Sequence, residues 1–217
     1  MKLQPGQRSR LDDDDDDEDE DDKSKPGEKP SKDPAPYLGK SLLDQRIVLV
    51  SKPVDRDLAA LVMAQLLILD ERDPAAPITM YVNSPGGDAD SGFGIYDMMR
   101  FVRPPITTVC IGLAASAGVT IFLGGTKGRR LTLPNSRFLI HQPRSFAQGQ
   151  ASDIEITAIQ IIKIRDAYVA SIAEATGRSV KKILDDVNRD YWLTAQEALD
   201  YGLADRVVTS FADLAEK

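Results

Sequence analysis

The stretch ITMYVNSPGGDADSGFGIYDMMRFVRPPITTVCIGLAASAG, residues 78–118, decides the fold class of this chain. It begins with a short apolar run typical of a buried strand, which ends at the turn residues of 83–87. A helical pattern follows over 88–101 until a proline pair interrupts it, and a second apolar strand is expected at 106–111. Strand, helix and strand in this order predict a right-handed crossover between parallel strands. We therefore expect an α/β protein with helices packed on a mostly parallel sheet.

The same alternation continues on both sides of this stretch. We expect strands at 46–50, 130–133 and 137–140, and helices at 54–69 and 114–123. In folds of this kind, reactive groups lie on loops beyond the carboxyl ends of the strands. The loops 83–88 and 112–118 both contain glycine, follow a strand and precede a helix, so we expect the chemistry there.

A long helix is predicted from about residue 152 to residue 176. Ser152 and Glu155 have the spacing of a capping box, which would begin this helix. Its isoleucines cover more of its circumference than the stripe that a helix needs to pack on one core. We therefore expect this helix to lie at a subunit interface. A second capping box at 194–197 predicts a short helix ending near residue 202.

Charge is distributed unevenly along the chain. The 217 residues carry a formal charge of −7. Residues 1–33 hold 13 acidic and 7 basic residues, which leaves 20 basic and 21 acidic residues for the remainder. Residues 1–36 also contain several prolines and few large apolar side chains, so they predict a disordered acidic extension before a folded domain at 37–217. This extension fits either a solubilising tail or an electrostatic gate.

Composition excludes several classes of protein. A single cysteine, Cys110, excludes a disulfide framework and a cysteine-rich zinc site, and a single histidine, His141, excludes a multi-histidine metal site. We therefore expect no metal and no cofactor. The chain has no apolar run of the roughly 18 residues that span a bilayer and no secretory signal. The nearly neutral folded part argues against nucleic-acid binding, so we expect a cytoplasmic protein without membrane or nucleic-acid partners.

Ser116 and His141 are the leading candidates for catalysis. Ser116 lies among small residues at a strand-to-helix junction, where it fits either a helix cap or a nucleophile. His141 follows an apolar strand and fits either a structural histidine or a general base near neutral pH. The backbone N–H groups of Gly87 and Ala117 are candidates for stabilising a developing oxyanion.

Spacing does not select the carboxylate that would orient the histidine. Asp190 lies between charged and aromatic residues, but Asp185 and Asp186 are equally compatible with the pattern.

Several segments taken together resemble one protein family, the proteolytic subunit of the caseinolytic (Clp) protease, ClpP. The resemblance covers residues about 44–210, and its motifs occur in order along the chain. These motifs are YVNSPGG at 81–87, GLAASAG at 112–118, LPNSR at 133–137, IHQP at 140–143, GQASDIEI at 149–156, RD at 189–190, EA at 197–198 and YGL at 201–203.

The resemblance implies a fold, a site and an activity. The fold would be the ClpP/crotonase fold, built of repeated ββα units with a protruding helical handle. Ser116 would be the nucleophile, His141 the base and Asp190 the orienting carboxylate, with oxyanion donors on the backbone of Gly87 and Ala117. The activity would be that of a serine endopeptidase, which cleaves unfolded proteins to short peptides through an acyl-enzyme.

The resemblance also implies partners. The long helix would match the handle by which two heptameric rings stack into a barrel with an internal chamber. A Clp-class unfoldase ATPase would feed unfolded polypeptides into that chamber, docking on positions that include Tyr81 and Phe101. Thr79 stands where another aromatic residue is common, so the docking surface is partly divergent.

Three other readings compete with an active peptidase. A structural or regulatory paralogue in mixed rings would usually lack a member of the triad, whereas this chain keeps all three. An acyl-CoA hydratase or isomerase of the same superfamily would lack the serine, histidine and aspartate set. A signal-peptide peptidase would use a Ser–Lys dyad and a membrane anchor.

Overall fold

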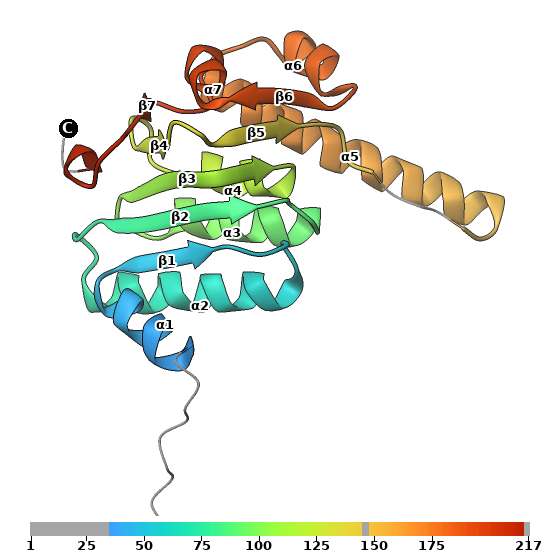
Figure 1. The fold of residues 1–217 in the computed structure, drawn as a ribbon. Coiled ribbons are helices and arrows are strands. Elements are labelled where there is room, and N and C mark those ends of the chain that lie inside the picture. Colours follow the sequence, from blue (N-terminus) through green and yellow to red (C-terminus); the bar gives the residue numbers. More distant parts are fainter. Residues whose placement is uncertain (1–34, 145–147, 215–217) are drawn as a thin grey trace, which may run out of the picture. The chain divides into compact units, whose positions relative to one another are not determined.

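A mostly parallel sheet organises the computed structural model, which describes residues 35–144 and 148–214 (Figure 1). Its strands are β1 (Ile47–Val50), β2 (Ile78–Ser84), β3 (Ile106–Ala115), β4 (Arg130–Thr132), β5 (Arg137–Ile140), β6 (Tyr191–Thr194) and β7 (Arg206–Val207). The helices are α1 (Ala35–Asp44), α2 (Arg56–Arg72), α3 (Ala89–Phe101), α4 (Ala117–Leu123), α5 (Ala151–Thr176), α6 (Val180–Val187) and α7 (Ala195–Tyr201), with a 3₁₀ turn η1 (Ala212–Leu214).

The parallel strands follow the order β1-β2-β3-β4-β7. The mostly parallel pairing is the one that the strand–helix alternation predicted. α2 connects β1 to β2, and α3 connects β2 to β3. This confirms the crossover predicted from residues 78–118. All the parallel strands therefore have their carboxyl ends on one edge of the sheet, where the loop at 85–88 and the turn at Ser116 lie. Residues 112–115, expected in a loop, belong to β3.

β3 is long enough to pair with two different strands on the same side. Its first half pairs with β4 through Thr108–Cys110, and its second half pairs with β5 through Leu113–Ala115. β6 then pairs with β5 in the antiparallel direction, with Ile140 opposite Tyr191. The end of β5 consequently lies beside the beginning of β6, and this arrangement determines the position of the residues that follow and precede them.

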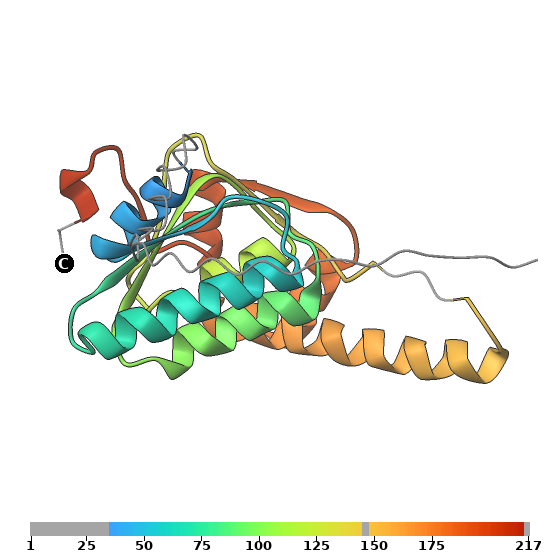
Figure 2. The ribbon, with the colours of Figure 1, turned by 90° about the horizontal axis from the view of Figure 1, so that it is seen from below.

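α2, α3, α4 and α5 cover one face of the sheet, and α1 lies on the other face (Figure 2). The main core forms between these helices and the sheet, and it includes Phe122, Phe138 and Leu66, all fully buried. A smaller apolar cluster surrounds Val109 and Leu131. The first half of α5 extends beyond the sheet and its covering helices (Figures 1 and 2).

Two predictions made at helix starts were wrong. The helix expected from residue 114 begins at Ala117, because Leu113–Ala115 are held in β3 by their pairing with β5. The capping box expected at Ser152 and Glu155 is not formed. α5 begins one residue earlier, with Gln150 as its cap residue and no side-chain capping bond.

The second capping box is confirmed. The Thr194 hydroxyl accepts from the Glu197 backbone N–H, and the Glu197 carboxylate accepts from the Thr194 N–H. α7 ends at Gly202, which has the left-handed conformation that favours glycine.

The sequence analysis missed α1, α6, β6 and β7. α1 begins at Ala35, inside the stretch expected to be disordered, and its Leu43 packs against the main core. The rest of the predicted acidic extension, residues 1–34, lies outside the described residues. β6 and β7 are only four and two residues long, so neither carries a recognisable alternation of apolar and polar side chains.

Candidate active site

Ser116 occupies a sharp turn between β3 and α4. Its backbone has φ 54° and ψ −122°, which is a strained conformation for a residue with a side chain. The Ser116 N–H donates to the Leu139 carbonyl at 2.8 Å, which ties the turn to β5. Ser116 is the cap residue of α4, yet its hydroxyl makes no capping bond. The side chain is therefore not engaged as a helix cap, one of the two interpretations that the sequence left open.

The loop Pro85–Asp88 approaches this turn closely. A Cβ added to Gly86 would lie 2.7 Å from Ser116 Cβ and 2.5 Å from the Ala115 carbonyl oxygen, so only glycine fits. Gly86 accepts from the Val54 N–H at 2.9 Å, and Asp88 donates to the Val54 carbonyl at 2.8 Å. These two bonds hold the loop against the segment before α2.

Gly87 and Ala117 both border the cavity that contains Ser116. Within residues 35–144 and 148–214, neither N–H donates to another backbone group. Ala117 is the first residue of α4, where N–H groups have no partner within the helix. Two N–H donors therefore remain available beside the serine.

His141 and Asp190 come together through the pairing of β5 with β6. His141 follows directly after β5, and Asp190 directly precedes β6. Because the two strands are antiparallel, these two residues lie side by side, and His141 Nδ1 is 3.5 Å from Asp190 Oδ1. This separation exceeds a normal hydrogen bond, and Nδ1 is buried without a hydrogen-bond partner among the described residues.

Arg144 binds the same carboxylate. Its Nη2 donates to Asp190 Oδ1 at 2.5 Å. Arg144, Pro143 and His141 border both the cavity at Ser116 and a second hollow that includes Asp190.

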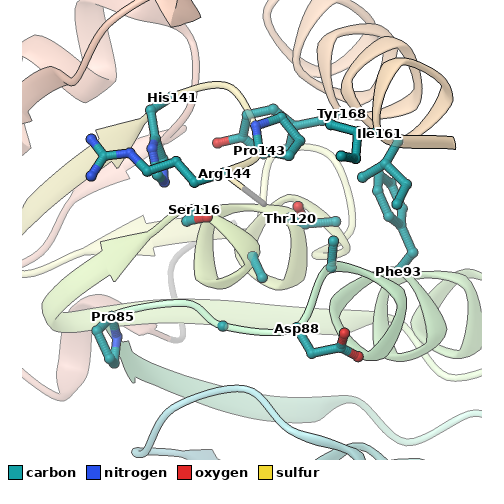
Figure 3. Close-up of a pocket in the computed structure, with 14 residues that line it drawn as sticks. Pro85, Asp88, Phe93, Ser116, Thr120, His141, Pro143, Arg144, Ile161 and Tyr168 are labelled. Atoms are coloured by element: carbon teal, nitrogen blue, oxygen red, sulfur yellow. The ribbon is translucent and has the colours of Figure 1, made fainter. Parts of the chain in front are cut away.

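A cavity of about 420 Å³ connects Ser116 with His141. Figure 3 shows Ser116 at the start of α4, with His141, Pro143 and Arg144 coming from the segment after β5. Ile161 and Tyr168 of α5 and Phe93 of α3 add an apolar wall (Figure 3). A cavity of this size, with an apolar wall and a few polar groups, suits a side chain of a bound peptide.

The electrostatic environment favours a neutral histidine. Burial lowers the pKa of His141, Asp190 raises it, and Arg144 lowers it. Burial also raises the pKa of Tyr168, whose hydroxyl is buried without a hydrogen-bond partner in the described part of the chain. An imidazole with a lowered pKa keeps a free lone pair at neutral pH, as a general base requires.

The buried thiol is a poor alternative nucleophile. Cys110 lies inside β3, and burial raises its pKa to about 12. A thiol with this pKa is protonated near neutral pH and therefore unreactive. Among the residues that the structure describes, no three His, Cys, Asp or Glu side chains gather closely enough to hold a metal ion.

The two residues expected in ATPase docking differ in burial. Tyr81 of β2 is half-buried against the small cluster of Val109 and Leu131. Phe101, at the end of α3, is 78% exposed and belongs to neither apolar cluster.

Three residues of the site were not predicted from the sequence. The buried Ser84 hydroxyl donates to the Lys52 carbonyl at 2.8 Å and accepts from the Gly86 N–H at 3.2 Å, which orders the glycine loop. In the sequence, Tyr168 could not be distinguished from the other apolar residues of its helix, and Arg144 could not be distinguished from an ordinary solvated cation. Of the three, only Ser84 could have been identified from the sequence, by its position within the motif at 81–87.

No helix within the described ranges combines the length and hydrophobicity needed to cross a bilayer.

Comparison with known proteins agrees with this fold. The sequence profile of the Clp protease family matches residues 34–211. Among solved structures, a substitution mutant of ClpP1 from Listeria monocytogenes is similar, with a TM-score of 0.76 and 40% sequence identity. The match covers 82% of this chain and 99% of that chain.

The fold and the matched structure define an α/β protein with the ClpP fold, a peptidase of the ClpP type. The profile match extends over most of the chain, and the chain belongs to the Clp protease family. This confirms the resemblance noted in the sequence and the expected fold class.

Proposed function

We propose that this chain is a serine endopeptidase subunit in which Ser116 is the nucleophile, His141 the general base and Asp190 the orienting carboxylate. One observation carries the proposal: an uncapped serine on a strained turn borders the same cavity as a half-buried histidine whose pKa is lowered by burial. Residues held in sparsely populated backbone conformations cluster at active sites, where the surrounding structure maintains the strain.

The mechanism follows from these groups. His141 takes the hydroxyl proton of Ser116 as the oxygen attacks the peptide carbonyl. The Gly87 and Ala117 N–H groups donate to the oxyanion that develops. His141 then gives the proton to the leaving amine, and an acyl-enzyme forms on Ser116. Water, deprotonated by the same histidine, releases the second peptide.

A covalent probe tests this function. Wild-type protein is expected to react with a fluorophosphonate at Ser116, as located by mass spectrometry of the digested protein, and to cleave short peptides without ATP. Labelling needs an activated serine, which a structural subunit does not have. A correctly assembled protein that neither labels nor cleaves would favour the alternative, a structural or regulatory subunit of mixed rings.

We further propose that two heptameric rings of this chain stack through α5. Several isoleucines in the first half of this helix are exposed in the single chain: Ile154, Ile156, Ile159 and Ile162. A row of exposed isoleucines on one projecting helix is typical of a surface that another subunit covers. The stacked rings would enclose the Ser116 cavities in a chamber that excludes folded proteins.

Ile156→Glu is expected to break up this assembly. Ile156 is 59% exposed in the single chain, so we expect the change to leave the fold intact. In the assembly, the second subunit that covers the helix would bury the new charge, which is unfavourable. We expect native mass spectrometry to find the full assembly reduced by about tenfold or more. Ile156→Leu, which preserves the apolar surface, is the matched control. An unchanged subunit count in Ile156→Glu would contradict the role of α5.

A Clp-class unfoldase ATPase is the partner that we propose, with unfolded polypeptides as substrates in the cytoplasm. Tyr81 and the exposed Phe101 are candidates for its docking surface.

The acidic residues 1–33 are proposed to act as an electrostatic gate within the extension at 1–36. Deleting residues 1–33 is expected to speed degradation of unfolded acidic proteins by about threefold at low salt, because it removes like-charge repulsion at the entrance. The gain should diminish at high salt, where exposed charges are screened. Degradation rates of an acidic and a basic unfolded substrate of equal length provide the comparison. Equal rates before and after deletion would leave only a solubilising role.

A further inference from the structure

One carboxylate oxygen in the site faces two competing donors. Arg144 Nη2 is 2.5 Å from Asp190 Oδ1, whereas His141 Nδ1 is 3.5 Å from the same atom. An N–H···O hydrogen bond usually spans about 2.7–3.2 Å, so the guanidinium engages this oxygen and the imidazole does not. His141 Nδ1 is left buried and unpartnered among the described residues.

This arrangement conflicts with what the proposed mechanism requires. In a serine, histidine and aspartate triad, the carboxylate accepts from the histidine Nδ1–H, which holds the correct tautomer and stabilises the imidazolium that forms. Asp190 can do this only if its oxygen moves toward His141. The bond from Arg144 opposes that movement because it engages the same oxygen, Oδ1.

We propose that Arg144 is a positioning residue that withholds Asp190 from His141, and that loss of the Arg144–Asp190 ion pair lets the histidine–aspartate hydrogen bond form. The inference rests on the proposed peptidase function and adds to it a residue that sets the fraction of active sites. Arg144 does not touch the reacting atoms; it acts through Asp190.

The ion pair is weak enough to be released. The Arg144 side chain is 73% exposed and that of Asp190 is 42% exposed, so water competes with the pair. Exposed pairs of this kind shift an equilibrium by no more than about fivefold. Arg144 is therefore expected to reduce activity rather than abolish it.

The groups that face His141 determine how its titration should respond. Asp190, before β6, and Arg144, after β5, are the charged groups that shift its pKa, in opposite directions. Tyr168 contributes a hydroxyl from α5, and its pKa is raised, so it stays neutral. Ser116 lies across the cavity, and Arg189 borders the hollow beside Asp190.

Removing Arg144 should therefore raise the pKa of His141. The substitution takes away a cation that disfavours the imidazolium and brings the Asp190 carboxylate closer. Since His141 must be neutral to act as a base, the acid limb of the kcat/KM profile should move to higher pH. A residue with a purely structural role would change the rate without moving this limb.

Arg144→Gln is the decisive variant. We expect kcat/KM for a short peptide, and the rate of fluorophosphonate labelling, to rise about two- to fivefold above the acid limb. Arg144→Lys retains the cation and should stay nearer to wild type. Lys127→Gln removes an exposed cation outside the site and is the matched control for loss of charge. Rates are expressed per assembled subunit, as counted by native mass spectrometry.

Two outcomes would overturn the inference. One is an Arg144→Gln protein that assembles but shows the wild-type rate or less, with an unmoved acid limb. Arg144→Leu provides a second neutral variant, so a folding defect in one of them does not decide the result. The other outcome is a wild type that fails to label at Ser116, which would overturn the proposed function as well. If the wild type labels at Ser116 but Arg144→Gln changes neither the rate nor the acid limb, this inference alone is overturned.

Discussion

Ser116→Ala is expected to abolish fluorophosphonate labelling and to lower peptidase activity by about 10⁴-fold or more. In serine peptidases, removal of the nucleophile alone eliminates nearly all of the catalysis that the triad supplies. The fold should survive, since the Ser116 hydroxyl makes no capping bond and its backbone N–H bond to Leu139 does not involve the side chain. Initial rates on a short fluorogenic peptide, measured without ATP, provide the readout.

The control is a serine outside the cavity. Ser152→Ala makes the same chemical change at an exposed position on α5 and should retain wild-type labelling. Thermal unfolding of both variants would reveal any general loss of stability. If Ser116→Ala still cleaved the peptide within tenfold of the wild-type rate, another group would have to be the nucleophile, and the proposed roles of His141 and Asp190 would fall with it.

Gly86→Ala is expected to lower activity by about 100-fold or more, because the new methyl group would push on the nucleophile turn. Its Cβ would lie 2.5 Å from the Ala115 carbonyl oxygen and 2.7 Å from Ser116 Cβ, both closer than van der Waals contact. The backbone φ of 86° adds strain for any residue with a side chain. The loop must shift, and Gly87 N–H shifts with it. Loss of one oxyanion donor typically lowers kcat by about 10²–10³.

Gly128→Ala separates the steric effect from backbone strain. Gly128 has a similar φ of 83°, but a Cβ there would meet no atom within 4 Å. We expect this variant to lose about 1–2 kcal/mol of unfolding free energy and to retain its activity. Peptide hydrolysis and thermal unfolding of both variants make the comparison. Equal activities for the Gly86 and Gly128 variants would mean that the glycine loop does not support the site.

The proposed role of Arg144 is to limit the fraction of sites in which the histidine–aspartate hydrogen bond forms. The nucleophile turn and the N–H donors are held by backbone pairing and so are present in the single chain. The histidine–aspartate contact depends on the exposed side chains of Asp190 and Arg144, so it can change without any change of fold. Activity would then respond to a local competition between two donors for one carboxylate oxygen.

Local patterns determined most of the central sheet. The strands and helices between 78 and 111 follow from apolar runs, helical spacing and a proline pair, which act over a few residues. Errors occurred where a distant partner prevailed over the local pattern. Ala114 and Ala115 were expected to begin a helix, but pairing with β5 holds them in β3.

The sequence by itself determined the family, the parallel architecture and the candidacy of Ser116 and His141. It did so because short motifs in a fixed order, one serine among small residues and a single histidine are all visible without knowing the fold. Local spacing left Asp190, Asp185 and Asp186 equivalent, and only the family resemblance favoured Asp190. The tertiary structure decided the contact itself, because the antiparallel pairing of β6 with β5 brings Asp190 to the histidine. The competing Arg144 bond is likewise invisible in sequence, because it depends on distances between side chains that are 46 residues apart.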